Sequence, residues 1–376
     1  MSVLLLILGI VLFICLIIIH EFGHFIIARR NNVQVEEFGI GFPPRAFSKK
    51  MSSGYILSLN WLPLGGFVRL KGEHDADTGK GSFGEANLWA KTKIIAAGVA
   101  MNLLACFIIL TFLSIVGLPQ IVNNQFTVSS NSKITKQEVL AGYIQPNSPA
   151  AKAGIKSQDS IVSIINDQGE KVDINSSNTL PNITKDNAGK TITLNYLYNG
   201  NQYSKNITLR TTSDVKASLK TNDPKGYLGI EPSNFVLKRY TWSAPIVSIG
   251  FMGQVTALTL KGIGSAVVGL VQGNTTKASS QVSGPVGIVV LLKDGSLLGY
   301  KFILLIVAII SLSLAIINIL PIPALDGGRL FFTVLPRLVL KRPLKQKTEE
   351  WIHGSGMVVL MLLFVLITIV DVRRFF

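Results

Sequence analysis

The 376-residue chain has little charge, and that charge is unevenly spread. Only 15% of its residues are charged, whereas soluble domains usually carry about 25%. No Asp, Glu, Lys or Arg occurs in residues 1–19, 94–118, 302–324 or 354–370. Each block is long enough, or nearly so, to cross about 30 Å of hydrocarbon at about 1.5 Å per residue. The shortage of charge therefore argues against an ordinary soluble protein and predicts four transmembrane helices.

Cysteine is also scarce. The two cysteines, Cys15 and Cys106, both lie within apolar blocks, so a disulfide framework is not expected and any outer domain must fold on its own core. The first apolar block lacks a basic start and an A-x-A-like cleavage site. We therefore interpret it as a retained helix rather than a signal peptide.

Acidic residues are fewer than basic ones, and the formal net charge is +15. A basic balance can indicate nucleic-acid binding, but here we interpret it as the basic loops of a membrane protein and expect no nucleic-acid partner. Lys and Arg gather between the first two blocks and between the last two. Short positive loops stay in the cytoplasm. Both termini, and the long segment between the second and third blocks, are therefore expected on the external side.

Two stretches between the blocks have a pattern of their own. After the first block, residues 54–59 and 66–70 alternate like short strands. Between the second and third blocks, residues 126–212 have the composition of a small soluble domain, in which Asn199-Gly200 is a hairpin signal. In chain order we expect a transmembrane helix over 1–28, a cytoplasmic loop with membrane-associated strands over 29–93, a second helix over 94–118, the soluble domain over 126–212, a linker and membrane-surface amphipathic segment over 213–300, a third helix over 301–340 and a fourth over 354–372.

The end of the first block reads His20-Glu21-Phe22-Gly23-His24, an H-E-x-x-H pattern. On a helix the two histidines share one face and can bind one metal ion. A catalytic zinc site takes three protein ligands and keeps a fourth position for water, and Glu21 fits the general base that accepts a proton from that water. The alternative is a chance match or histidines packed at a helix end. Ionisable groups at membrane depth are costly and functional by default, which favours the metal site.

Asp326 is the predicted third ligand. It is the first charged residue after residue 301, and two glycines follow it. Pro321 and Pro323 interrupt the helix before it, and a broken helix is tolerated in a membrane only where it lines a cavity or is covered by protein. Counted from the external side, His20 and Asp326 both arrive toward the cytoplasmic leaflet, so their depths agree. An ordinary turn at a helix end is the alternative.

The two motifs together resemble those of a known family. H-E-F-G-H in the first block and N-x-x-P-x-P-x-L-D-G-G over residues 318–328 are similar to the signatures of the site-2 protease family of intramembrane zinc metalloproteases. The regulator of sigma-E protease type is the most similar, and the resemblance covers nearly the whole chain. It implies Zn²⁺ bound by His20, His24 and Asp326, Glu21 as the catalytic base, and Asn318 as a hydrogen-bond partner of the substrate backbone.

The resemblance also implies a fold and a place in the cell. The fold is membrane α-helical, with four transmembrane helices, a membrane-associated β-element and one inserted α+β PDZ-like domain. The protein would lie in a bacterial cytoplasmic (inner) membrane, with both termini and the PDZ-like domain on the periplasmic side. Its partners would be the lipid bilayer and single-span membrane proteins, such as an anti-sigma factor or remnant signal peptides. It would cut these in or next to their transmembrane segments, in regulated intramembrane proteolysis.

Residues 62–72 resemble the family's membrane-associated β-element. A peptide bond inside a helix is shielded by the helix's own hydrogen bonds, so a protease must unwind it first. An exposed strand edge can hold an unwound segment by β-strand addition. We therefore expect Gly66, Phe67, Val68 and Arg69 to bind substrate, with an ordinary surface hairpin as the alternative.

Three further motifs leave alternatives open. Residues 143–166 look like part of a PDZ domain, which would either bind a peptide or exclude substrates that keep large outer domains. Asn102 lies in a segment similar to the family's G-P-x-x-N signature, with Val99 in place of Pro, and is either a packing residue or part of the catalytic site. Residues 283–288 also resemble a family motif, or form a turn before a helix.

Two other functions are compatible with parts of the pattern. One is a non-proteolytic, PDZ-bearing membrane scaffold or sensor with a structural zinc site, which needs no general base at Glu21. The other is a transporter or ion pathway lined by intramembrane His, Asp and Asn. Neither explains an H-E-x-x-H pattern paired with a distant Asp-Gly at matching depth.

Overall fold

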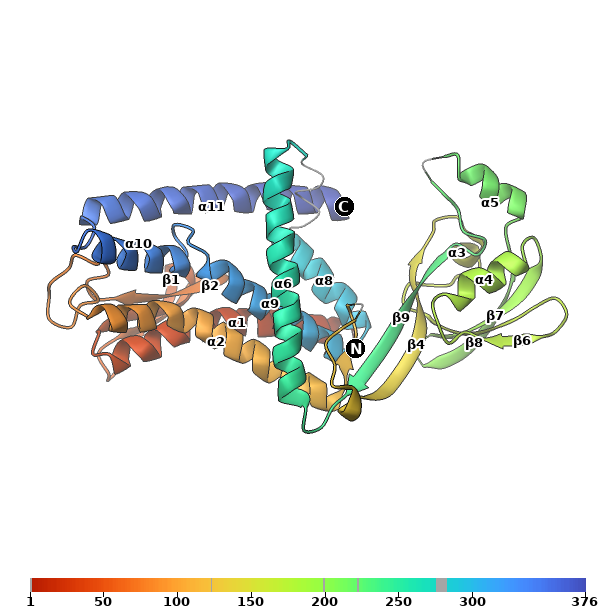
Figure 1. The fold of residues 1–376 in the computed structure, drawn as a ribbon, viewed down its shortest axis with the longest axis horizontal. Coiled ribbons are helices and arrows are strands. Elements are labelled where there is room, and N and C mark those ends of the chain that lie inside the picture. The colour runs from red at the N-terminus through yellow and green to blue at the C-terminus, as the bar shows by residue number, and fades with distance from the viewer. Residues whose placement is uncertain (1, 123, 199, 222, 275–282) are drawn as a thin grey trace. The chain divides into compact units, whose positions relative to one another are not determined.

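The computed structural model describes residues 2–122, 124–198, 200–221, 223–274 and 283–376 (Figure 1). The chain divides into two compact units. Unit 1 comprises Met1–Leu113 and Ser243–Phe376, and unit 2 comprises Ser114–Trp242. Unit 1 contains the long apolar helices, and unit 2 contains the polar domain.

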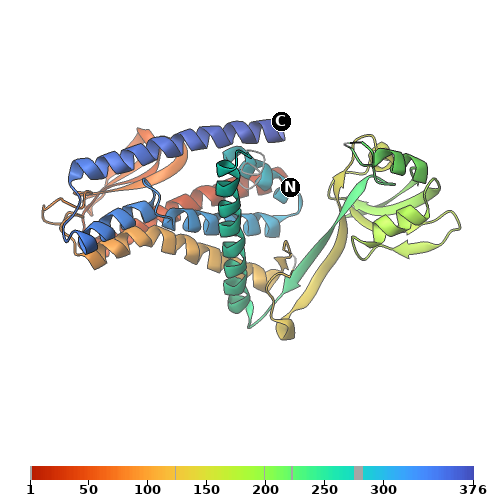
Figure 2. The same ribbon diagram turned by 45° about the horizontal axis from the view of Figure 1, so that its top comes forward.

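Five helices among the described residues are long and apolar enough to cross a membrane. Four of them cover most of the charge-free blocks of the sequence, and the fifth, α6, lies in the segment expected at the membrane surface. In both views α6 runs across the direction of the other four (Figures 1 and 2). The five are α1 (Ser2–Arg30), α2 (Leu88–Val116), α6 (Ala244–Val271), α9 (Tyr300–Ile319) and α11 (Gln346–Phe375).

The segment expected as a third helix over 301–340 is two helices, α9 and α10 (Asp326–Val339). The break follows from the two prolines between them. Each proline lacks an N–H and pushes the residue before it out of the helical region, and Leu320 is indeed extended (φ −66°, ψ 145°). Asp326 is therefore the first residue of a new helix.

A shorter helix, α8 (Pro285–Leu297), precedes α9 and accounts for the motif at residues 283–288. The backbone N–H groups of Gly284 and Gly287 both donate to Oδ2 of Asp371, each at 2.8 Å. Asp371 lies near the end of α11 and is buried. The motif is thus the start of a helix that a carboxylate of α11 caps.

The predicted β-element is present as two long strands, β1 (Val35–Lys50) and β2 (Ile56–Leu70), which form one sheet. The middle of β1 pairs on both sides: Phe38 lies opposite Val68 on one side and Leu57 on the other. The second half of β1 pairs back on residues 56–60. The sheet therefore has four runs, in the order 66–70, 37–40, 56–60 and 45–50, and residues 66–70 form one edge.

Unit 2 is a sheet with short helices around a core of its own, which includes Ala150, Ile164, Leu194 and Leu228. The strand order is β3-β9-β4-β5-β7-β8, and β6 pairs with β5. The strands are β3 (Leu118–Pro119), β4 (Lys133–Ile144), β5 (Ser160–Ile165), β6 (Lys171–Asp173), β7 (Thr191–Tyr198), β8 (Asn201–Thr208) and β9 (Ile230–Arg239), and the helices are η1 (Ser129–Asn131), α3 (Pro149–Lys152), α4 (Thr179–Asp186) and α5 (Thr212–Ser218).

The hairpin predicted near residue 200 is present as β7 and β8, although Asn199 itself lies outside the described residues. The segment expected as a linker and membrane-surface segment over 213–300 begins differently from this expectation. Its first part contains α5 and β9, and β9 pairs along the whole of β4, from Lys133↔Arg239 to Ile144↔Ile230. The partner strand lies about a hundred residues away in sequence, so local composition could not reveal the pairing.

Candidate metal centre

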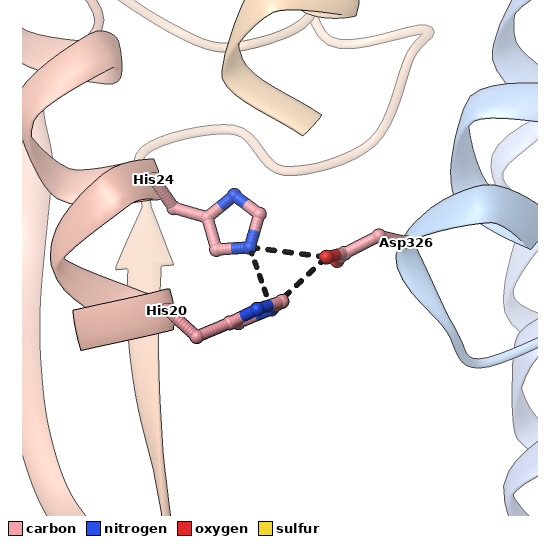
Figure 3. Close-up of side chains that lie close together, drawn as sticks. All are labelled: His20, His24 and Asp326. Carbon is pink, nitrogen blue, oxygen red and sulfur yellow. Dashed lines mark hydrogen bonds and ion pairs between the residues drawn. The ribbon is translucent and has the colours of Figure 1, made fainter. Parts of the chain in front are cut away.

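His20, His24 and Asp326 come together in unit 1 (Figure 3). Nε2 of His20 lies 3.0 Å from Oδ2 of Asp326, and Nε2 of His24 lies 3.3 Å from the same oxygen. The two Nε2 atoms are 3.2 Å apart. The helical spacing of the histidines places both imidazoles on one face of α1, and the first residue of α10 supplies the carboxylate.

These three atoms fit a zinc ion. Ligand atoms at about 2.0–2.1 Å in tetrahedral geometry lie about 3.3 Å from one another, close to the spacing observed. Among the described residues, Oδ2 of Asp326 is buried and has no hydrogen-bond partner, although both imidazoles are within 3.3 Å. Three potential ligand atoms thus lie within 3.3 Å of one another, which is the arrangement that a cation would complete.

Helix α2 orients both imidazoles through their other nitrogen. The backbone carbonyl of Ile94 lies 2.8 Å from Nδ1 of His24, and Nδ2 of Asn102 lies 3.2 Å from Nδ1 of His20. Oδ1 of Asn102 is buried and has no partner among the described residues. Exchange of the amide oxygen and nitrogen lets Nδ1–H of His20 donate to this oxygen and leaves Nε2 for the metal. Asn102 therefore contacts the imidazole of His20 directly and does more than pack between helices.

Gly98 makes room for the two rings. A Cβ at this position would lie 2.4 Å from Nε2 of His24 and 2.5 Å from Nε2 of His20. Any side chain on this face of α2 would occupy the place of the ligand atoms. The histidine pair therefore depends on a glycine in another helix, which is the first residue of the segment similar to the G-P-x-x-N signature.

The loop between α9 and α10 is held closely around Asp326. A Cβ at Gly327 would lie 2.2 Å from the carbonyl oxygen of Ile319, and a Cβ at Gly328 would lie 2.0 Å from that of Ile322. The two glycines after Asp326 thus let the loop fold back over the first turn of α10. His353 of α11, which sequence reasoning left without a role, accepts a hydrogen bond from the N–H of Ala324 through Nδ1 at 3.2 Å.

Glu21 faces the edge of the β-element. A Cβ at Gly66 would lie 3.1 Å from Cγ of Glu21, and the backbone N–H of Val68 is a hydrogen-bond partner of the Glu21 carboxylate. The N–H of Leu70 also points away from β1, since it donates to Glu73 at 2.8 Å. Outward N–H groups alternate along this edge, and one of them is directed at the predicted base.

The other predicted substrate-binding residues are placed less directly. Asn318 lies half-buried in the last turn of α9, and its side chain makes no hydrogen bond with any described residue. The ring of Phe67 packs over Gly39. Arg69 forms ion pairs with Glu36 at 3.2 Å and with Glu37 at 2.7 Å. The side chain of Arg69 is therefore engaged within the sheet, and its backbone, between the outward N–H groups of Val68 and Leu70, points toward β1.

Comparison with known proteins gives one family. The profile described as Peptidase family M50 matches residues 8–363. A protein of Clostridium acetobutylicum, named a zinc metalloprotease, is 30% identical over 371 residues, which cover 97% of this chain and 96% of the relative. Relatives of the same description from Campylobacter jejuni and Fusobacterium nucleatum are 29% identical over 96% of this chain and 90% of the relative, and 26% identical over 96% of both.

Proposed function

Because the chain belongs to peptidase family M50, and is a membrane zinc metalloprotease in that sense, we propose that it hydrolyses peptide bonds in or next to the transmembrane segments of other membrane proteins. The observation that carries this proposal is the convergence of His20, His24 and Asp326 on one point of the helical unit. The proposal includes the site-2 protease mechanism, of the regulator of sigma-E type, in a bacterial inner membrane.

In this proposal His20, His24 and Asp326 hold the zinc ion that the family uses. When bound, zinc polarises the substrate carbonyl and lowers the pKa of water. Glu21 accepts a proton from the attacking water and then donates it to the leaving amine. Asn102 and the carbonyl of Ile94 keep the imidazoles oriented throughout.

Water must reach a site that lies among apolar helices. A cavity of about 440 Å³ has Asp326 in its wall. Its lining is otherwise mostly charged or polar, which suits a hydrated path and not a lipid-filled one. The polar residues of this lining are Glu73, His74, Arg329, Glu349, Glu350 and His353. We infer that hydrolytic water enters through this cavity.

The substrate would bind as an added strand. Residues 66–70 form an edge of the β-element, and the outward N–H of Val68 contacts Glu21. A substrate segment unwound from its helix can take these N–H groups and lie alongside the base. Asn318, whose amide is unpaired among the described residues, is the second proposed contact with the substrate backbone.

The placement of the spans supports four crossings. Helix α1 begins, and α11 ends, at the same end of unit 1, as an even number of crossings requires (Figure 1). Helix α6 has the length and composition of a span but runs across the others (Figure 2). A helix that runs across four spans lies along the membrane and not through it, so we propose that α6 is a surface helix. Both termini and unit 2 are then external.

Unit 2, the proposed PDZ-like domain, has one feature that favours peptide binding. Residues 230–234 of β9 pair with β4 on one side, while on the other side β3 pairs only with Leu237 and Lys238. In the turn before β9, the carbonyls of Tyr227 and Leu228 accept hydrogen bonds from Arg210 and Ala150. Such a turn followed by a free edge is suited to a peptide C-terminus. Steric exclusion of large substrates is the competing role for this unit.

The test is cleavage by the purified, zinc-loaded protein of a panel of single-span membrane substrates, with fragment masses as the readout. Glu21→Gln keeps the shape of the side chain and removes the base, so cleavage should fall by roughly 10²–10⁴-fold while zinc content is unchanged. Glu138→Gln on β4 of unit 2 is the matched control and should cleave like the unaltered protein.

Persistent cleavage by Glu21→Gln would exclude Glu21 as the base. Absence of any Glu21-dependent fragment across the panel would favour the scaffold or sensor with a structural zinc site. Ion flux across proteoliposomes without a cleaved product would favour the transporter.

A further inference from the structure

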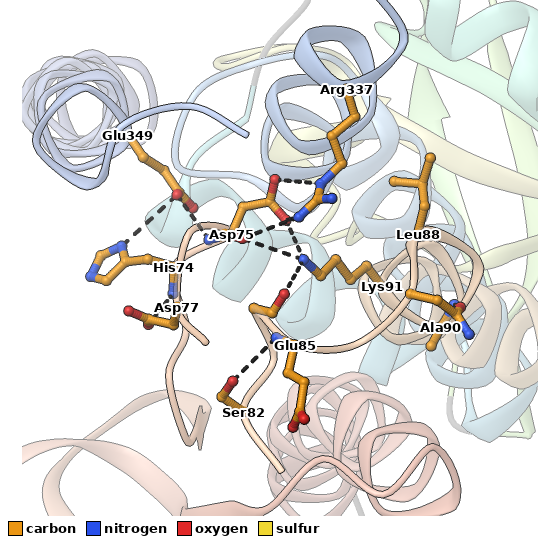
Figure 4. Close-up of polar contacts among 12 residues, drawn as sticks. His74, Asp75, Asp77, Ser82, Glu85, Leu88, Ala90, Lys91, Arg337 and Glu349 are labelled. Carbon is orange, nitrogen blue, oxygen red and sulfur yellow. Dashed lines mark hydrogen bonds and ion pairs between the residues drawn. The ribbon is translucent and has the colours of Figure 1, made fainter. Parts of the chain in front are cut away.

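A buried charged cluster lies in unit 1 around Asp75, in the loop between β2 and α2 (Figure 4). Asp75 accepts hydrogen bonds from Nζ of Lys91 on α2, and from Nε of Arg337 on α10 at 2.8 Å. Nη2 of Arg337 donates to Oδ1 of the same carboxylate at 3.0 Å. The backbone N–H of Asp75 donates to Glu349 of α11 at 3.1 Å. One residue thus joins its loop to three helices.

The cluster is costly to bury and balanced in charge. Asp75 is 3% exposed, Lys91 0% and Glu349 6%. Lys91 also donates to the carbonyl of Gly84 at 2.7 Å, and its ammonium lies near the ring of Phe83. Buried ion pairs add little stability compared with apolar packing, but they hold a specific geometry, and removing one partner leaves the other uncompensated. The cluster is therefore better suited to fixing positions than to adding stability.

The cluster fixes the positions of two helices that form the metal site: α2, which orients the imidazoles, and α10, which carries Asp326. Lys91 lies one turn before Ile94, whose carbonyl orients His24, and two turns before Gly98. Arg337 lies in the same helix as Asp326, about 16 Å further along at about 1.5 Å per residue. Arg337 and Asp326 belong to one continuous helix, which includes Pro336, so a shift at Arg337 is passed along the helix toward Asp326.

A second contact also links this loop to α10. Arg329, one turn after Asp326, donates to the carbonyl of Glu73 at 2.7 Å, and its guanidinium stacks over Phe83 at 4.8 Å. The loop therefore holds α10 both near its start and near its end. Among the described residues, no hydrogen bond or ion pair joins this loop to the proposed metal ligands, so its action on the site is indirect.

We propose that Asp75 is a positioning residue of the metal site, which by bridging Lys91 of α2 and Arg337 of α10 holds Asp326 against the two imidazoles. The inference rests on the zinc site proposed above. Loss of the bridge lets α10 shift relative to α1 and α2, and the third ligand is then less often at coordination distance.

The test measures zinc affinity of the full-length protein by competition with a chelator. Asp75→Asn removes the bridging charge, and Arg337→Gln removes only the link to α10 while the Lys91 pair remains. Both should weaken zinc binding by about tenfold, the lower end of the range for residues outside the ligand set. The two effects should not add in the double variant, because both cut the same bridge.

The matched controls are Asp77→Asn in the same loop and Arg342→Gln, an exposed arginine just after α10. Among the residues that the structure describes, the carboxylate of Asp77 accepts a hydrogen bond only from the N–H of His74. Both variants should bind zinc like the unaltered protein. Asp326→Asn is the reference and should abolish binding.

Unchanged zinc affinity in Arg337→Gln, with or without a lower melting temperature, would overturn the proposal, because a merely structural cluster predicts that result. Arg337 is partly exposed, so this variant decides the matter even if Asp75→Asn does not fold. If instead Asp326→Asn keeps full zinc affinity, the metal site is misassigned and the positioning role falls with it. If zinc affinity falls in Asp326→Asn but not in Asp75→Asn or Arg337→Gln, the metal site stands and only the positioning role of Asp75 is excluded.

Discussion

At the scale of single residues, the proposed metal site is shaped by glycines as much as by its proposed ligands. Gly98 on α2 lies directly against both imidazoles, and Gly23 on α1 lies against the backbone of α2: a Cβ there would be 2.6 Å from the carbonyl oxygen of Ala97. The two helices are therefore in close contact at the level of the site, and they cannot separate locally to admit another side chain without losing packing.

Gly98→Ala should weaken zinc binding by at least about tenfold, because the added methyl group overlaps the ligand nitrogens. Chelator competition measures the effect, and proteolysis should fall with it. Gly253→Ala on α6 is the control, since a Cβ there meets nothing within 4 Å. Wild-type affinity in Gly98→Ala would contradict the close contact of α1 and α2.

At the scale of elements, Glu37 holds together the four runs of the β-element. Its carboxylate accepts hydrogen bonds from Nε of Arg45 at 2.9 Å, from Oγ of Ser58 at 2.7 Å and from Nη2 of Arg69 at 2.7 Å. Burial disfavours its charged form, but the hydrogen bonds from Arg45 and Ser58 and the charge of Arg69 outweigh this and hold the pKa of Glu37 below its usual value. An ionised Glu37 at neutral pH keeps the edge at residues 66–70 in place beside α1.

Cross-linking tests whether a substrate adds to this edge as a strand. Phe67→Cys and Val68→Cys, in an inactive Glu21→Gln background without Cys15 and Cys106, should form disulfides with single cysteines placed along a substrate. An added strand alternates its faces, so cross-linking to each position should recur at every second substrate residue. A period of three to four residues would show that the substrate binds as a helix and would exclude strand addition.

At the scale of the whole molecule, unit 2 is an insertion with its own core. The chain enters and leaves it at neighbouring points, since the N–H of Tyr240 donates to the carbonyl of Ser114 at 2.8 Å. All the buried residues of its core cluster lie between Val139 and Leu228. Its removal therefore need not expose the core of unit 1.

Replacement of residues 114–242 by a short flexible linker should leave zinc binding intact. If unit 2 excludes bulky substrates, cleavage of a substrate with a folded outer domain should rise several-fold, while a trimmed substrate is cut at the usual rate. We expect this result. Slower cleavage of the trimmed substrate would instead show that unit 2 recruits peptides, as its free β9 edge would allow. The intact protein and a Glu21→Gln variant of the deletion serve as controls.

Local patterns in the sequence were enough for the parts of the site that depend on neighbours along the chain. Charge-free runs predict apolar helices, the i, i+4 spacing puts His20 and His24 on one face, and Pro321 and Pro323 end α9 before Asp326. These follow from helix geometry and from the proline ring, which act within a few residues.

Contacts between distant segments were decided only by the tertiary structure. Asn102 contacts His20, which lies 82 residues away in the sequence, and Arg337 contacts Asp75, which lies 262 residues away. The pairing of β9 with β4 is equally remote. The sequence around Gly98, Asn102 or Asp75 does not predict which distant residue each of them contacts. Those contacts depend on how whole helices and strands pack. The sequence by itself therefore determined which residues can hold a metal, and the packing of α1, α2 and α10 decided how they are brought together.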